Sequence, residues 1–191
     1  SRFPALGEGD FLLAVLNDLR KNFKTRAKIL LTGYSRGGQF THRFAFAHPE
    51  LVLAAAPCSS GTWTTPDGRL LIETYGQVEE PEKFLSNPAN REKIPERLLG
   101  IFNDERVAGV AGLKAMPDAQ QVPFLVMCGS LDTRFGIAQD FARSLSENGF
   151  SVETEWPRTP HGSRSDPEYA IEFEKYSVRV VDFFVRQTES N

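Results

Sequence analysis

The sequence has few cysteines, no long apolar run and no excess of one sign of charge, and each shortage excludes a class of protein. Two cysteines in 191 residues do not make a disulfide-rich scaffold. No apolar run approaches the roughly 20 residues needed to span a bilayer. The net charge is −3 with both signs scattered along the chain, so there is no electrostatic footprint for nucleic acid or an anionic membrane.

Neither cysteine has the spacing of a metal ligand, and no metal or cofactor is expected. Cys58 and Cys128 each end an apolar segment, and we expect two buried free thiols, with a disulfide between them as the alternative. The chain begins at Ser1 without a methionine and shows no signal peptide. The sequence therefore leaves the compartment open, cytoplasmic or secreted, and also the oligomeric state.

Amphipathic and short apolar segments alternate along most of the chain. Periodicity predicts helices over 10–23, 36–47 and 137–149 and from residue 167 onward, and strands over 27–32, 51–56, 123–128 and 151–156. This alternation predicts an α/β protein with a parallel sheet flanked by helices. The length and the 40% hydrophobic content suit a single domain over 1–191.

One stretch, residues 62–121, interrupts this alternation. It is polar, contains five prolines and has weak helical patches such as 96–103. We expect a partly helical insertion over the strand ends.

A glycine-rich hexapeptide, Gly33-Tyr34-Ser35-Arg36-Gly37-Gly38, directly follows the apolar run 29–31. It fits the G-x-S-x-G pattern of a nucleophile elbow, in which a sharp strand-to-helix turn exposes a serine hydroxyl. Gly33 and Gly37 fit because side chains there would crowd the turn. An ordinary serine in a glycine-rich turn is the alternative, but the strand-to-helix context favours a nucleophile.

A nucleophilic serine needs a base, and the sequence offers three histidines. His42 lies on the helix that follows Ser35 and His48 lies at its far end, so we expect both at the surface or the edge of the core. His161 follows the last expected strand, in a loop that can lie over the strand ends. His161 is therefore the candidate base.

The base in turn needs an orienting carboxylate, and chain order places it between Ser35 and His161. Asp132 follows the strand 123–128, and a carboxylate at the carboxyl end of a parallel strand faces the ligand crevice. Asp166 is the rival, although its position before Pro167 suits a helix cap. Asp140 lies inside a helix pattern and is expected in solvent.

The segments 30–40, 47–49, 54–57, 129–132 and 161–162 together resemble the C-terminal half of the α/β-hydrolase fold. They are similar to serine esterases of the polyhydroxybutyrate-depolymerase and feruloyl-esterase group. The resemblance implies that Ser35 attacks an ester carbonyl, that His161 takes its proton and returns it to the leaving alcohol, and that Asp132 orients the imidazole. The expected partner is a small-molecule ester.

The resemblance also implies an oxyanion hole, with the backbone N–H of Arg36 as one donor. The second donor normally comes from a loop after the third strand of the fold, and four strands expected ahead of the elbow helix are absent. We therefore expect the C-terminal portion of a hydrolase, completed by an N-terminal segment of the same protein; a minimal fold is the alternative.

Three further side chains, Tyr34, Thr62 and Trp63, are expected near the substrate pocket, with packing under the insertion as an equal reading for Trp63. Two other functions stay open. One is a serine peptidase of the prolyl-oligopeptidase type, which shares the triad order. The other is a ligand-binding module that keeps the fold without catalysis.

Overall fold

The central feature of the computed structural model is a parallel sheet that follows the predicted alternation. The structure describes residues 7–72, 76–78, 89, 113–162 and 167–189. The alternating elements are α1 (Gly7–Asn22), β1 (Ile29–Tyr34), α2 (Arg36–Ala47), β2 (Val52–Cys58), β6 (Phe124–Met127), α7 (Phe135–Glu147), β7 (Val152–Glu155) and α8 (Pro167–Glu189). The α/β class and the parallel sheet are confirmed.

The four strands lie in the order β1-β2-β6-β7, and every neighbouring pair is parallel. Tyr34 pairs with Cys58, Cys58 pairs with Met127, and Met127 pairs with Glu155. The carboxyl ends of all four strands therefore lie at one edge of the sheet. The segments that follow them meet there, where parallel sheets bind ligands.

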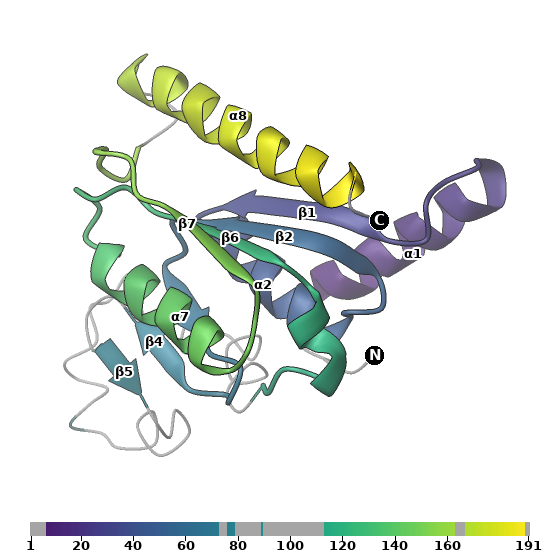
Figure 1. Ribbon diagram of the computed structural model, residues 1–191, viewed down its shortest axis with the longest axis horizontal. Helices are drawn as coiled ribbons and strands as arrows, with labels where there is room; N and C mark the ends of the chain where they lie inside the picture. Colours follow the sequence, from purple (N-terminus) through teal and green to yellow (C-terminus); the bar gives the residue numbers. More distant parts are fainter. Residues whose placement is uncertain (1–6, 73–75, 79–88, 90–112, 163–166, 190–191) are drawn as a thin grey trace.

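Helices cover both faces of the sheet, with α8 on one face and α2 and α7 on the other (Figure 1). Under α8, Ala54, Ala56 and Met127 pack against Tyr176 and Phe183. A larger cluster on the opposite face joins α2 and α7 to the sheet. Burial on both faces explains why β2 and β6 are almost continuously apolar.

The described part of the predicted insertion begins as a second sheet rather than as helix. Its antiparallel strands are β3 (Thr62–Thr64), β4 (Leu70–Ile72) and β5 (Gly76–Val78), and a 3₁₀ helix, η1 (Pro117–Gln121), precedes β6. Pro66-Asp67-Gly68 forms the turn between β3 and β4, with Gly68 at a φ of 93°. The weak helical patch at 96–103 lies outside the described residues.

One prediction about the histidines is wrong, because His42 is fully buried rather than at the surface or the edge of the core. Its Nδ1 lies 2.8 Å from Gly38 O, and the Thr64 N–H donates to its Nε2 at 3.0 Å. Burial, reinforced by the charge of Arg43, holds the pKa of His42 well below its usual value. A neutral imidazole therefore connects α2 to β3.

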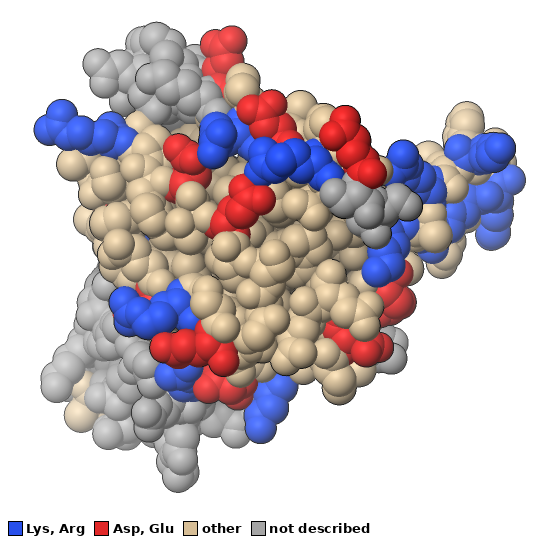
Figure 2. Space-filling view, viewed as in Figure 1, with Lys and Arg blue, Asp and Glu red and all other residues tan. Residues whose placement is uncertain are grey.

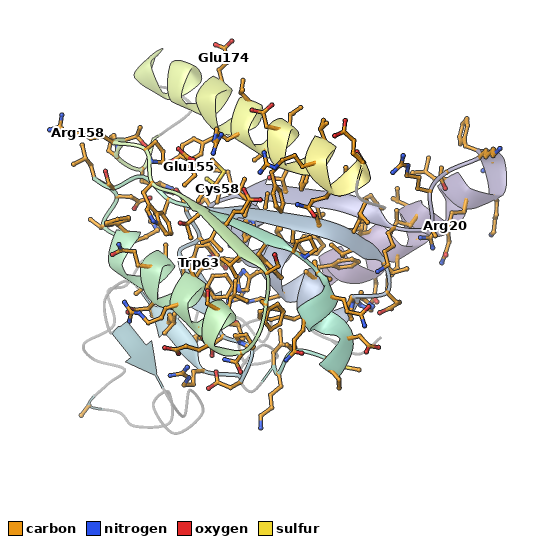
Figure 3. The ribbon with its side chains drawn as sticks, viewed as in Figure 1. Arg20, Cys58, Trp63, Glu155, Arg158 and Glu174 are labelled. Carbon is orange, nitrogen blue, oxygen red and sulfur yellow. The ribbon has the colours of Figure 1, made fainter. Side chains whose placement is uncertain are left out.

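Both cysteines are buried free thiols. Burial raises the pKa of Cys128 to about 12 and that of Cys58 still further. Figure 3 places Cys58 between the sheet and α8, whereas Trp63 lies on the other face beside α7. Within the described residues, no helix combines the length and the apolar character that a membrane crossing requires.

Candidate active site

Ser35 occupies a strained turn between β1 and α2. It has φ 55° and ψ −112°, a conformation that costs a non-glycine residue about 1–3 kcal/mol. The Ser35 N–H donates to Cys58 O at 2.9 Å, which fastens the turn to the end of β2. Its side chain makes no capping hydrogen bond to α2, so the hydroxyl is not used to begin the helix.

Two of the three glycines around Ser35 are required by close contacts. A Cβ at Gly33 would lie 2.4 Å from the carbonyl carbon and oxygen of Gly37, and one at Gly38 would lie 2.7 Å from Cys58 O. The reason predicted for Gly37 is wrong, because a Cβ there meets nothing within 4 Å. The sequence pattern did not identify Gly38 as a required glycine, because the atom that its Cβ would meet, Cys58 O, lies at the end of β2 and not in the elbow.

Asp132 and His161 are brought together by the loops after β6 and β7. His161 Nδ1 lies 2.8 Å from Asp132 Oδ2. The Asp132 side chain is fully buried, and that of His161 is 25% exposed. A carboxylate on Nδ1 fixes the ring tautomer and leaves Nε2 as the nitrogen that can accept a proton.

Asp132 is held as an anion by several donors at once. Burial alone would raise its pKa, but the hydrogen bonds from His161 and from the Arg134 backbone, together with the nearby charge of Arg134, hold the pKa below its usual value. The Arg134 N–H and Nη1 approach Asp132 Oδ1 at 3.0 and 3.1 Å. Sequence reasoning missed Arg134; an arginine two residues after the carboxylate, in the same loop, was the available signal.

A cavity of about 910 Å³ brings the predicted residues together. Ser35 and Arg36 line it from the elbow, Tyr34 from the end of β1, and His161 from its loop. Residues 176–184 of α8 form the opposite wall. Because Arg36 is the first residue of α2, its N–H belongs to the first turn of that helix, which has no intrahelical acceptor.

Other predicted residues lie elsewhere. Trp63 is fully buried, with its ring stacked on Phe141 at 4.5 Å, and the Thr62 hydroxyl accepts from Arg43 at 2.8 Å. Neither residue lines the cavity that Ser35 shares with His161. Asp140 is exposed, as expected, and it also pairs with Arg143, whereas Asp166 lies outside the described residues.

Two features of the described residues bear on metal ions and on anionic partners, neither of which the sequence predicts. No group of three or more His, Cys, Asp or Glu side chains within this part of the chain could hold a metal ion. Basic and acidic residues intermingle over α8, whereas basic residues gather around the end of α1 (Figure 2).

The fold is that of the α/β hydrolases, and solved structures share it. An S-formylglutathione hydrolase from Staphylococcus aureus is 20% identical, covering 91% of this chain and 62% of its own, with a TM-score of 0.53. An esterase from Pyrococcus furiosus is 17% identical, with 93% and 60% covered and a TM-score of 0.52. An esterase from the fungus Rhizomucor miehei is 13% identical, with 94% and 58% covered and a TM-score of 0.55.

These likenesses establish the fold. The chain spans about three fifths of the length of the three solved proteins. No family model and no curated protein matches the sequence.

Proposed function

We propose that this protein is a serine hydrolase that cleaves carboxylic esters through an acyl-serine intermediate. One observation carries the proposal. A serine in a strained strand-to-helix turn opens into the same cavity as a histidine whose Nδ1 is bonded to a buried aspartate. Such strain persists where the surrounding structure enforces it, most often at functional sites.

The chemistry follows from the roles of the three side chains. The Ser35 hydroxyl attacks the ester carbonyl while His161 Nε2 takes its proton, and the imidazolium then gives that proton to the leaving alcohol. Asp132 stabilises the imidazolium through Nδ1. The Arg36 N–H, at the positive end of α2, donates to the oxyanion. Water then attacks the acyl carbonyl while His161 takes its proton, and the imidazolium returns that proton to Ser35 as the bond to the serine breaks and the acid is released.

A second oxyanion donor is needed for full activity, and we propose that it comes from a further segment of the same protein. The solved neighbours are longer than this chain, and the outer edge of β1 has no partner strand among the described residues. Removing one oxyanion donor typically costs about 10²–10³-fold in kcat. Residues 1–191 alone should therefore form the acyl-serine more slowly than the whole protein.

Labelling with a fluorophosphonate tests the nucleophile directly, because the reagent traps an activated serine without requiring turnover. We expect a single adduct on Ser35, abolished in Ser35→Ala and retained in Asp140→Asn, which changes an exposed carboxylate. An unlabelled protein that still binds an ester analogue would replace the hydrolase with a ligand-binding module. Faster cleavage of aminoacyl amides than of nitrophenyl esters would instead make it a peptidase.

A further inference from the structure

Tyr34 is the last residue of β1 and directly precedes the proposed nucleophile, yet its side chain contacts the proposed base. The Tyr34 and His161 rings stack with centroids 5.1 Å apart and planes inclined by 23°. The tyrosine oxygen lies 3.4 Å from His161 Nδ1. The backbone of Tyr34 is fixed by its pairing with Cys58. A ring carried on the strand of Ser35 thus touches the imidazole directly.

A second tyrosine extends this contact to the loop that carries His161. Tyr34 meets Tyr176 edge-on at 6.3 Å, and the Tyr176 hydroxyl lies 3.2 Å from Thr159 Oγ1. Thr159 O in turn accepts from the Leu131 N–H at 3.1 Å. The two tyrosines therefore join β1 and α8 to both loops from which Asp132 and His161 come.

The hydrogen bond to Asp132 cannot by itself fix the imidazole, because a single bond at Nδ1 leaves the ring free to rotate about it. The second constraint is the ring of Tyr34, which packs against one face of an imidazole that is 25% exposed. The two distances rank the contacts: Asp132 at 2.8 Å takes the Nδ1 proton, and the Tyr34 oxygen at 3.4 Å adds a weaker contact.

From these contacts we infer that Tyr34 is a positioning residue for His161, and that its aromatic face rather than its hydroxyl does the positioning. This inference rests on the proposed function and gives Tyr34 a role in addition to its place in the wall of the cavity. Because Tyr34 directly precedes Ser35 in the chain, it ties the position of the base to that of the nucleophile. Small displacements of such groups reduce rates by roughly 10- to 100-fold.

Three variants separate the ring from the hydroxyl. Tyr34→Phe keeps the stack and should retain kcat within about 3-fold, since it removes only the weaker contact. Tyr34→Leu removes the stack and should lower kcat and the rate of fluorophosphonate labelling by roughly 10- to 100-fold, with little change in KM. Phe40→Leu is the matched control, because it removes a half-buried ring that packs against Phe44, with centroids 5.4 Å apart. It should leave kcat unchanged.

Proton NMR of the imidazole N–H that is bonded to Asp132 gives a readout independent of turnover, with His161→Gln to assign the signal. We expect the signal in the unmodified protein and in Tyr34→Phe, and its loss by exchange in Tyr34→Leu. If Tyr34→Leu does not fold, Tyr34→Met offers a longer and more adaptable side chain without an aromatic face, and it should behave as expected for leucine.

Three results would overturn the inference: equal kcat in the Phe and Leu variants, an unchanged N–H signal in the Leu variant, or an effect on KM alone, which would mean that Tyr34 acts only as part of the cavity wall. A protein that neither reacts with the fluorophosphonate nor cleaves esters would refute the proposed function. The N–H signal would then still decide whether Tyr34 orders the histidine.

Discussion

The two edges of the sheet are built differently. The strand β7 has four residues, and its Glu153 and Glu155 pair with α8 through Arg186 at 2.6 Å and Arg179 at 2.9 Å. The strand β1 has six residues, and Leu30 on it is 37% exposed. Natural sheets protect their edges with short strands and charges. By this standard β7 is an edge strand, whereas β1 has the sequence of an interior strand.

The proposed catalytic groups also come from two different parts of the sheet, one near β7 and the other near β1. Asp132 and His161 come from the loops after β6 and β7, where Arg134, Tyr176 and Thr159 surround them. Ser35 follows β1, next to the exposed Arg36. Residues 1–191 thus supply both Asp132 and His161, whereas they supply only one of the two proposed oxyanion donors, the Arg36 N–H. The two sides should respond differently to substitution.

The largest effect is expected on the enclosed side. Asp132→Asn should lower kcat for an activated ester by about 10⁴-fold, because an amide favours the wrong tautomer of His161. Asp140→Asn is the matched control, an exposed carboxylate bonded to Arg143 at 3.0 Å. Where turnover is too slow, the rate of fluorophosphonate labelling replaces it. A variant that kept a tenth of the activity would assign the orienting carboxylate elsewhere, with Asp166 the first residue to examine.

The turn at Ser35, which lies between these two sides, should also be sensitive to substitution, but there the effect is on the free energy of unfolding. Gly33→Ala places a Cβ 2.4 Å from backbone atoms of Gly37 and should lower the free energy of unfolding by about 3 kcal/mol or prevent folding. Gly37→Ala meets nothing within 4 Å and should raise it by about 0.5 kcal/mol, because alanine favours the helix. Urea unfolding measures both, and similar losses in the two variants would mean that the elbow is packed differently.

How far the sequence predicted these features depends on whether each feature is local. Period and motif sufficed for β1, for the turn at Ser35 and for α2, because adjacent residues determine them. Chain order also sufficed to select Asp132 and His161, which lie 2.8 Å apart. The burial of His42 could not be predicted in this way, because it depends on Thr64 of β3. Three-residue strands such as β3 and β4 are too short to show a periodic pattern, and the turn residues Pro66-Asp67-Gly68 are the only sequence signal for them.

The buried His42 should make stability depend on pH. Its pKa is lowered by folding, so the unfolded chain binds the extra proton below about pH 6.5 while the native state stays neutral. The free energy of unfolding should have its highest value above that pH and should fall by up to about 1.4 kcal/mol per pH unit on acidification. Asp132, whose pKa is also lowered, adds a loss only below about pH 4.

Urea unfolding between pH 7 and pH 5 therefore isolates the histidine from the carboxylate. His42→Gln should remove the slope, whereas His48→Gln should keep it, because His48 is only half-buried beside Glu50. A slope that survives in His42→Gln would assign the proton to another group. This test probes the packing of α2 against β3, on the face opposite α8.

The smallest effect is expected at the outer edge of β1, where two neighbouring leucines have different surroundings. Leu31 packs against the larger core cluster, and Leu30 contributes to neither cluster. Leu30→Lys should change the free energy of unfolding of residues 1–191 by less than about 1 kcal/mol, whereas Leu31→Lys should cost about 2–4 kcal/mol. Equal losses that grew with protein concentration would show that a second copy covers β1, and size-exclusion chromatography would detect that dimer. A small loss for Leu30→Lys in a monomer would instead leave this edge available to another segment of the same protein, which is what the proposed second oxyanion donor requires.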